Sequence, residues 1–446
     1  MLMQSRISAG AYEIDITPPL GVDLAGYFNV RKADSILDNL YAKSVVLKDG
    51  DTEVAITSCD LCVIPREMVL AIRAFASQWS GIPEENIMIS ATHTHTGPVT
   101  TGLLAGEIDS TYIEVLVKKI ASSIAMAKKN LKEASVRAGR GKEQNLVFNR
   151  RYVMKDGWVK TNPGKLNPDI IKPAGPVDPD ILVILLEDNT KSPIALLVNY
   201  ANHVDTIGGT GISADYPGIL SNTIKRFLGD IPVLFLTGAE GDINHIDVMD
   251  SNPQGGYEEA KRIGITLAGE VLKVLVKLTP INGYLGIKSS FLDVPVRKPD
   301  QIEVDKAKKL LEETGEMSSG ELTAFDLAKG SLEVERAYAQ EVTALLQLDR
   351  DLEELELQAI SLGELVFLGV PGEPFAEIGL AIKRESPFSY TGIVSLANGY
   401  SGYIPTEKAF DEGGYEIRLA RSSKLDKATE KTIIREGITL INSIYK

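Results

Sequence analysis

The stretch MISATHTHTGPV, residues 88–99, joins an apolar run of strand type to a polar segment that holds two of the chain's four histidines. Side chains two positions apart in a strand point to the same face, so His93 and His95 would share one cavity if the strand persists through this stretch. Imidazole is the commonest metal-binding side chain, and a catalytic zinc site typically uses three protein ligands and a water. On its own, the pair also fits two hydrogen-bonded histidines at a strand end.

Segments that alternate between strand and helix patterns surround this stretch. Strand patterns cover residues 44–50 and 52–59, and helical patterns cover residues 65–79 and 110–131. Such alternation predicts an α/β fold. The length of 446 residues leaves open one large domain or two, because it is about two to three times the usual length of a single domain.

Residues 299–356 differ from the rest of the chain, because they are strongly charged, carry two helical patterns and show no strand signal. We interpret this segment as a helical insertion at the surface. A lid over a site and a position remote from it are both compatible with the sequence.

The composition excludes several classes of function. The formal net charge is −14 and the isoelectric point is about 5.0, so the surface repels phosphate backbones and nucleic acid is not expected as a partner. No apolar run approaches the roughly 18–20 residues of a membrane span, and the N-terminus lacks the apolar core of a secretory signal. We therefore expect a cytoplasmic protein with a small-molecule substrate, although a secreted protein with its leader removed would have the same sequence.

Cys59 and Cys62 have the spacing of a redox motif or of half a zinc site, but the chain has no second cysteine pair. Residues three apart in a strand point to opposite faces, which prevents both thiols from binding one metal ion there. We predict two buried core thiols, in line with the general tendency of free cysteine.

Three further residues extend the candidate site. His203 follows an apolar strand pattern and precedes glycines that allow a backbone to approach a ligand closely, although taken alone such a histidine is more often structural. His245 lies near Glu240 and Asp242 in a glycine- and acid-rich segment, and we favour a loop position for its side chain. Glu373 follows a Pro-Gly turn, where it either completes a metal site or caps the helix that begins after it.

Six motifs carry a resemblance to a known family. They occur in the order and approximate spacing of the N-terminal catalytic domain of neutral ceramidases, and they extend over nearly the whole chain. The motifs are GAYEIDITPPLG (10–21), ATHTHTGP (91–98), NYANHVDT with ISADYPG (199–206 and 212–218), TGAEGDIN (237–244), GVPGEPF (369–375) and YSGYIPTEKAFDEGGYE (400–416).

The resemblance implies an architecture and a zinc site. It implies one large mixed α/β domain over residues 1–446, with α/β/β/α-type layers and the insertion at 299–356, and without the C-terminal immunoglobulin-like domain of typical ceramidases. It implies zinc ligands at His93, His203, Glu373 and Tyr403. It further implies that His95 faces the reacting centre, that Arg150 lines it, and that Asp242 and Asn244 belong to the catalytic loop, while Tyr400 is a weaker candidate expected to serve packing.

One departure from the family bears on the reaction. Where the family has a serine implicated in amide cleavage, this chain has Asn244, which cannot act as an alkoxide nucleophile. An asparagine can still donate a hydrogen bond to a developing oxyanion while a metal-activated water attacks the carbonyl. The departure weakens ceramide as a substrate more than it weakens zinc chemistry.

We therefore carry three hypotheses for the function. The leading one is a zinc-dependent hydrolase that cleaves an amide bond in a ceramide-like or other N-acyl, lipid-like substrate, with His95 as general acid or base. The second is a zinc hydrolase of an ester or sugar-linked substrate. The third is a non-catalytic protein that retains the metal and binds a ligand, with Asn244 as the sign of lost catalysis. The sequence indicates no particular oligomeric state.

Overall fold

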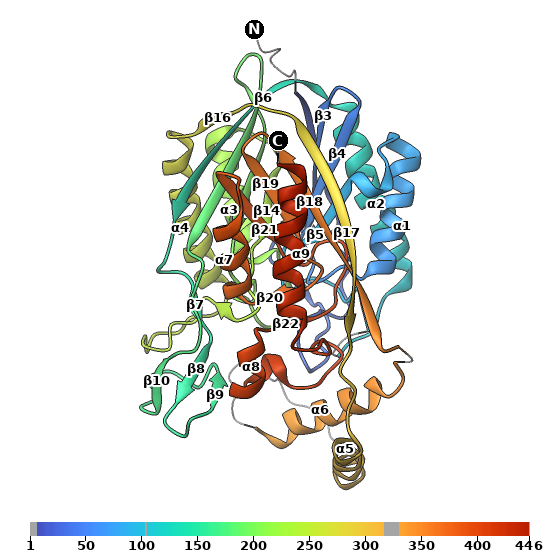
Figure 1. The fold of residues 1–446 in the computed structure, drawn as a ribbon, viewed down its shortest axis with the longest axis vertical. Helices are drawn as coiled ribbons and strands as arrows, with labels where there is room; N and C mark the ends of the chain where they lie inside the picture. Colours follow the sequence, from blue (N-terminus) through green and yellow to red (C-terminus); the bar gives the residue numbers. More distant parts are fainter. Residues whose placement is uncertain (1–6, 103–104, 316–329, 349, 446) are drawn as a thin grey trace.

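The computed structural model describes residues 7–102, 105–315, 330–348 and 350–445. A large curved sheet runs through it (Figure 1), with the strand order β14-β12-β11-β6-β1-β3-β4-β5 and β16 paired with β6. Its strands are β1 (Ser8–Asp15), β3 (Tyr41–Asp49), β4 (Thr52–Cys59), β5 (Ile87–Ala91), β6 (Lys132–Lys142), β11 (Asp180–Asp188), β12 (Pro193–Tyr200), β14 (Val233–Thr237) and β16 (Thr279–Ile281). Four helices pack on one face of this sheet, namely α1 (Arg66–Ser80), α2 (Ser110–Lys129), α3 (Asp215–Leu228) and α4 (Tyr257–Leu275).

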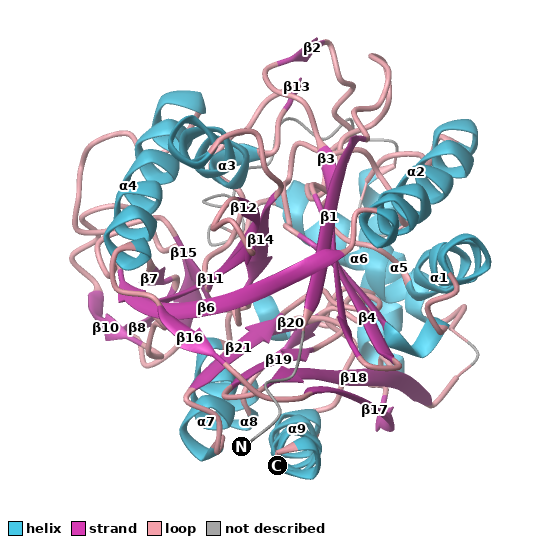
Figure 2. Ribbon diagram, turned by 90° about the horizontal axis from the view of Figure 1, so that it is seen from above, coloured by secondary structure: helices cyan, strands magenta, loops and turns pink. Residues whose placement is uncertain are grey.

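A second sheet lies against the other face of the large sheet. Its strand order is β17-β18-β19-β21, with β17 (Leu285–Pro295), β18 (Leu352–Leu362), β19 (Leu365–Gly369) and β21 (Tyr390–Val394). Helices α7 (Ala376–Glu385) and α9 (Thr429–Ile444) cover its outer face (Figure 2). The predicted α/β fold with α/β/β/α layers is therefore confirmed.

Short elements connect these layers. The strands are β2 (Ser35–Ile36), β7 (Phe148–Asn149), β8 (Arg151–Met154), β9 (Val159–Thr161), β10 (Ile170–Pro173), β13 (Gly211–Ile212), β15 (Ile243–Asn244), β20 (Glu373–Pro374) and β22 (Tyr403–Ile404). The helices are α5 (Gln301–Thr314), α6 (Leu332–Leu345) and α8 (Glu407–Glu412), together with two 3-10 turns at Glu84–Asn86 and Tyr415–Ile417. Across the residues that the structure describes, no helix combines the length and the apolar character that a bilayer crossing requires.

Apolar side chains hold the layers together as the sequence periodicity predicts. Ile72 and Ile120 of the first two helices pack on the large sheet, and Ile56 and Phe367 meet between the two sheets. The strand patterns at 44–50 and 52–59 fall within β3 and β4, apart from the turn residue Gly50. The helical patterns at 65–79 and 110–131 coincide with α1 and α2 to within two residues at each end.

The large sheet is strongly curved, so that strands far apart in its order come together. The Ser58 hydroxyl, at the end of β4, donates to the carbonyl of Phe235 in β14 over 2.6 Å. The Thr237 hydroxyl, at the end of β14, donates to the carbonyl of Thr92 over 2.9 Å. The carboxyl ends of β5, β12 and β14 therefore meet at one end of the molecule, where ligand sites of α/β proteins form.

Within the predicted helical insertion at 299–356, the structure describes two helices and a strand at the end, while residues 316–329 and 349 lie outside the described residues. Helices α5 and α6 lie within 299–356, but residues from Leu352 onward begin strand β18. Only the first residues of this strand were assigned to the insertion, because buried acids interrupt its apolar pattern: Glu356 pairs with Arg73 at 2.8 Å, and Glu353 pairs with Lys424 at 3.4 Å.

Helix α6 lies beside the site rather than remote from it. The ring of Tyr338 in α6 packs against Phe28, with centroids 5.7 Å apart, and against Tyr415, with centroids 6.5 Å apart. Glu341 of the same helix accepts hydrogen bonds from the guanidinium of Arg421 at 2.6 and 2.9 Å. Because Tyr415 lines the pocket described below, α6 supports one wall of that pocket.

Candidate metal centre

Three side chains from distant parts of the chain converge at this end of the sheet. His93 follows β5, His203 follows β12, and Glu373 lies in β20. The Nε2 atoms of His93 and His203 are 3.1 Å apart, and His93 Nε2 lies 3.4 Å from Oε2 of Glu373. Tetrahedral coordination with metal–nitrogen bonds of about 2.0–2.1 Å places neighbouring ligand atoms about 3.3 Å apart, so the group has the dimensions of a tetrahedral metal site.

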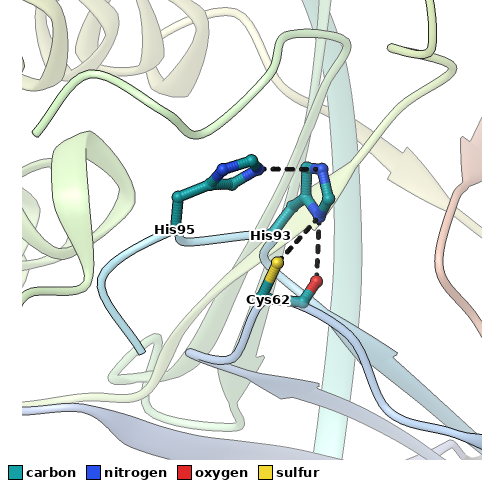
Figure 3. A group of neighbouring side chains, drawn as sticks. All are labelled: Cys62, His93 and His95. Carbon is teal, nitrogen blue, oxygen red and sulfur yellow. Dashed lines mark hydrogen bonds between the residues drawn. The ribbon is translucent and has the colours of Figure 1, made fainter. Parts of the chain in front are cut away.

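A hydrogen bond fixes the tautomer of His93. Its Nδ1 lies 2.9 Å from the carbonyl oxygen of Cys62, and 3.8 Å from the sulfur of the same residue (Figure 3). Because a carbonyl only accepts, Nδ1 carries a proton, and in the neutral ring that binds a metal Nε2 has the lone pair that faces His203 and Glu373. Such a partner on the second nitrogen is the usual support of a metal-binding imidazole.

The backbone at His93 is not a strand. β5 ends at Ala91, and His93 has a φ of 76°, in the left-handed region that side chains other than glycine rarely adopt. The expectation that the strand persists through this stretch is therefore wrong. His93 and His95 share a cavity all the same, with 3.3 Å between their Nε2 atoms, because a turn rather than a pleat brings them together.

Glu373 was expected either to complete a metal site or to cap helix α7, and the contacts of Asp242 decide between these two roles. Oδ1 of Asp242 accepts the backbone N–H of Ala376 in the first turn of α7 over 2.7 Å, and Oδ2 accepts from Asn149 over 2.7 Å. Asp242 thus serves the helix terminus, and Glu373 is left for the metal group. The structure therefore does not direct Asp242 at the reacting centre, in contrast to its predicted place among the catalytic residues.

Two tyrosines flank Glu373. Strands β20 and β22 pair in parallel with Glu373 opposite Tyr403, so the phenol that the resemblance implies as a ligand lies beside the carboxylate. The hydroxyl of Tyr400 donates to Oε1 of Glu373 over 2.8 Å. Tyr400, a weaker candidate that was expected to serve packing, is therefore a direct partner of a metal-group residue.

Arg150 and Asn244 lie next to the group, as predicted. Nε of Arg150 donates to Glu416 over 2.8 Å, and a terminal nitrogen donates to the carbonyl of Gly241 over 2.8 Å. The amide nitrogen of Asn244 donates to Oδ1 of Asn162 over 3.1 Å. Both residues line a cavity that also reaches His203.

His95 lies between His93 and Asp205. Its Nδ1 lies 3.7 Å from Oδ1 of Asp205, and the hydroxyl of Tyr27 donates to the same oxygen. Asp205 carried no signal in the sequence pattern, since it lies two residues beyond His203 in a loop.

Charge at the centre is concentrated on His93 and Glu373. Burial opposes the charged form of His93, but the Glu373 carboxylate outweighs it and holds the pKa of His93 well above its usual range. Burial and the charge of His93 keep the pKa of His95 well below its usual range, and burial and Arg150 do the same for His203. Burial and the Glu373 charge raise the pKa of Glu240 to about 8. A divalent cation would take the place of the His93 proton, because ligating imidazoles are neutral.

A narrow pocket leads to the centre. It has a volume of about 40 Å³ and is lined by His93, His95 and Glu373 together with apolar and aromatic side chains that include Val63, Val99 and Tyr415. Cys62 also lines it, whereas Cys59 is fully buried in the core. Both thiols are buried and free, as predicted, but the sequence did not indicate that Cys62 borders the site.

The donor set fits a metal ion. Two imidazoles whose Nε2 atoms face each other, one carboxylate and a neighbouring phenol are ligands that zinc accepts, and Oε2 of Glu373 has no hydrogen-bond partner among the described residues. His245 stays outside this set, as expected, because its Nε2 donates to the carbonyl of Gln254 over 2.8 Å.

Several known proteins are similar to this chain in sequence or in fold. Neutral ceramidase A of Dictyostelium discoideum is 22% identical over 502 aligned positions, which cover 92% of this chain and 69% of that protein. Neutral ceramidase of Mycobacterium tuberculosis is 21% identical over 429 positions, which cover 83% of this chain and 66% of that one. The crystal structure of neutral ceramidase from Pseudomonas aeruginosa superposes with a TM-score of 0.73 at 18% identity, covering 99% of this chain and 75% of that chain.

A family model agrees with these relatives. Residues 7–226 match the model described as neutral/alkaline non-lysosomal ceramidase, N-terminal. The matched segment contains His93, His95, Arg150 and His203 of the centre described above. The chain is therefore similar to the neutral/alkaline non-lysosomal ceramidase family, through the family model over residues 7–226 and through relatives that align with most of its length.

Proposed function

We propose that this chain is a zinc-dependent hydrolase that cleaves the amide bond of an N-acyl, ceramide-like substrate. The proteins that it resembles are named for ceramide hydrolysis, which supports the amide bond as the target. One observation carries the proposal: His93, His203 and Glu373 meet in a buried pocket. The Nε2 atoms of the two histidines are 3.1 Å apart, and His93 Nε2 lies 3.4 Å from Oε2 of Glu373.

His93, His203, Glu373 and Tyr403 would hold the zinc ion. When bound, the ion supplies Lewis acidity for a substrate carbonyl and for water. Tyr400 would keep Glu373 in place through the hydrogen bond to Oε1. The remaining residues of the centre are available to bind the substrate and to move protons.

His95 is placed to accept and return a proton. Its ring is neutral because burial and His93 lower its pKa, and its Nε2 lies at the centre while Asp205 faces Nδ1. A neutral imidazole beside the reacting carbonyl can take a proton from the attacking water and transfer it to the leaving amine.

Arg150 and Asn244 would orient the substrate. Arg150 is fixed by Glu416 and by the carbonyl of Gly241, so its guanidinium is a rigid element of the wall. Asn244 has two amide N–H donors and uses one on Asn162, which leaves one for a developing oxyanion. Loss of one such donor typically costs about 2.7–4 kcal/mol of transition-state stabilisation. Since an amide is no nucleophile, the attacking group in this proposal is water.

Metal analysis tests the proposal first. The parent protein should contain close to one zinc ion per chain by elemental analysis, and His93→Ala and Glu373→Ala should lose both the ion and amide hydrolysis. Glu258→Ala, at an exposed position in α4, is the matched control and should retain both. Amide hydrolysis that persists in a zinc-free His93→Ala variant would refute the proposal.

A substrate panel tests the bond. Matched N-acyl amides and O-acyl esters with the same acyl chain should show metal-dependent turnover of the amides. Turnover of the esters alone would replace the amidase assignment by an esterase. Absence of turnover for the whole panel, with zinc bound, would favour the binding protein that the Asn244 substitution suggested.

A further inference from the structure

The narrow pocket beside the metal group has two walls that come from distant segments of the chain. Residues 99–101 form one wall, and Tyr415 and Ser422 belong to the other. Helix α6 packs behind the second wall, where the rings of Tyr338 and Tyr415 have centroids 6.5 Å apart. Because the pocket lies between these walls, their separation limits the size of the group that it can hold.

Arg421 joins the two walls. One terminal nitrogen of its guanidinium donates to the carbonyl of Gly102, directly after the first wall, over 2.6 Å. The other terminal nitrogen and Nε donate to the carboxylate of Glu341 in α6 over 2.6 and 2.9 Å. We call Arg421, Glu341 and the Gly102 carbonyl the arginine clasp. Since Arg421 directly precedes Ser422, the arginine clasp ties α6 and the second wall to the first wall.

The arginine clasp is a stiff link. The side chain of Glu341 is 6% exposed, and its carboxylate also accepts the backbone N–H of Arg421 over 3.0 Å. A planar guanidinium that meets a carboxylate with two nitrogens has a fixed orientation, and hydrogen bonds between charged groups are stronger than neutral ones. The third hydrogen bond, to Gly102, therefore holds the loop of the first wall at a defined distance.

Each wall is also attached to the rest of the molecule. The hydroxyl of Thr100 donates to the carbonyl of Val63 over 2.6 Å. The carbonyl of Ser422 accepts the backbone N–H of Tyr403 over 2.9 Å. The pocket therefore widens only if one of these contacts or the arginine clasp breaks.

The volume of the pocket is small. It amounts to about 40 Å³, whereas one water molecule needs roughly 10–15 Å³. The pocket thus has room for about three or four groups of the size of a methylene. Its lining at Ala25, Val63 and Val99 is apolar, which suits the alkyl part of an acyl group.

We propose that the arginine clasp limits the acyl group of the substrate to a short chain, of about four carbons or fewer. Arg421 and Glu341 are then specificity-determining residues that act through the position of the loop at 99–102. This inference rests on the proposed function for the presence of an acyl group beside the metal group. It narrows the substrate class from N-acyl amines in general to those with a short acyl group.

Equilibrium binding of two hydroxamic acids to the zinc-loaded full chain tests the inference. Acetohydroxamic acid and octanohydroxamic acid share a zinc-binding head group and differ by six methylenes. In a pocket that buried all six, each methylene would strengthen binding by about 4-fold, so octanohydroxamic acid would bind more than about 1,000-fold tighter. Because the pocket has no room for the longer chain, we expect the two dissociation constants from isothermal titration calorimetry to differ by less than about 10-fold.

Two variants assign this limit to the arginine clasp. Arg421→Lys keeps a positive charge opposite Glu341, but an ammonium lacks the planar fork that reaches Glu341 and Gly102 together. Glu341→Gln keeps the size of the side chain and removes the charge that fixes Arg421. In each variant the preference for octanohydroxamic acid should rise by at least about 10-fold, with unchanged zinc content and unchanged affinity for acetohydroxamic acid.

Arg418→Lys is the matched control. Arg418 pairs with Glu335 of the same helix through two hydrogen bonds of 2.9 Å. The substitution therefore weakens an equivalent ion pair of α6 but leaves the bond between Arg421 and Gly102 in place. It should keep the parental ratio of the two affinities, which separates loss of the arginine clasp from a general loosening of α6.

The outcomes distinguish this inference from the proposed function. A parent that binds octanohydroxamic acid more than about 10-fold tighter than acetohydroxamic acid, or a zinc-loaded parent that binds neither, would overturn the short-chain limit. A parental ratio in both clasp variants, or an equal change in Arg418→Lys, would show that the arginine clasp does not set the limit. A parent that shows the limit, and loses it in the two variants, but hydrolyses no amide would refute the proposed function alone.

Discussion

The hydroxyl of Tyr400 donates to Oε1 of Glu373 over 2.8 Å, so it holds the carboxylate with Oε2 directed at His93. Tyr400→Phe removes this hydrogen bond and leaves the ring in place. We expect the zinc affinity to fall by about 10- to 100-fold, which is the usual effect of losing a partner that orients a metal ligand.

Competition with a zinc chelator measures this change. Tyr390→Phe removes an exposed hydroxyl that contacts Thr279 and should leave the zinc affinity unchanged. An unaltered affinity in Tyr400→Phe would show that Glu373 keeps its position without the tyrosine.

A second residue-scale prediction concerns Asp38, whose pKa is raised to about 6 by burial, with smaller contributions from Asp60 and Asp215. The folded-state pKa of this carboxyl lies above its unfolded value of 3.8, so its stabilising effect is complete below about pH 4 and is lost as the pH rises through about 6. Asp38→Asn keeps both contacts, because the amide oxygen accepts from the Ala214 N–H and the amide nitrogen donates to the Ser213 hydroxyl.

The variant should therefore be more stable than the parent by about 1–3 kcal/mol at pH 7 and nearly equal to it at pH 4. Urea unfolding of both proteins at the two pH values measures the difference. A difference that does not change with pH would mean that the Asp38 carboxyl has an ordinary pKa.

At the scale of elements, the loop after β14 is packed directly on β20. A methyl group at Gly241 would overlap the carbonyl oxygen of Glu373, which is backbone and cannot rotate away. Gly241→Ala should therefore displace β20, lower the free energy of unfolding by about 1–3 kcal/mol and weaken zinc binding. Thermal unfolding and elemental analysis report the two effects separately.

Gly269 supplies the contrast, since it lies in α4 and a methyl group there has no neighbour within 4 Å in the described structure. Gly269→Ala should raise stability by about 0.5–1 kcal/mol, because alanine is the better helix former. Were Gly241→Ala to bind zinc as the parent does, the packing of this loop on β20 would not be needed for the site.

Local sequence patterns predicted those helices and strands in which the apolar side chains are buried. Apolar spacing located α1 and α2, because each buries one apolar face against the large sheet, and apolar runs located β3 and β4, because both faces of these strands are buried. The pattern placed the start of β18 a few residues too late, because Glu353 and Glu356 occupy buried positions there and are neutralised by cations from other segments. It failed at His93, whose left-handed backbone has no signature in residue types alone.

At the scale of the whole molecule, the order of motifs along the chain was enough to predict the candidate ligands. It was not enough to predict which side chains contact these ligands. His93, His203, Glu373 and Tyr403 lie in motifs that resemble a family. His93 and His203 meet because the large sheet curves until β14 meets the ends of β4 and β5. Tyr400 and Cys62 contact Glu373 and His93 at this point, and Asp205 lies beside His95. Curvature of this kind is a property of the packed layers, which no short stretch of sequence specifies.

Because of this curvature, the three residues of the metal group come from distant segments, and an ion bound to them would link these segments in the folded chain. His93 follows an edge strand of the large sheet, His203 follows a strand near its other edge, and Glu373 follows the second sheet. An ion that binds only the folded chain adds about 4 kcal/mol to the free energy of unfolding at a free concentration of 1,000 times its Kd.

Removal of zinc with a chelator should therefore lower the melting temperature of the parent, and added zinc should restore it. Glu373→Ala should melt at a lower temperature than the zinc-loaded parent and respond to neither treatment, because it lacks the ligand that joins the two sheets. Differential scanning fluorimetry measures the melting temperatures of the parent and of Glu373→Ala, each with zinc and with chelator. If the parent loses its zinc without a change in melting temperature, packing alone holds the segments together.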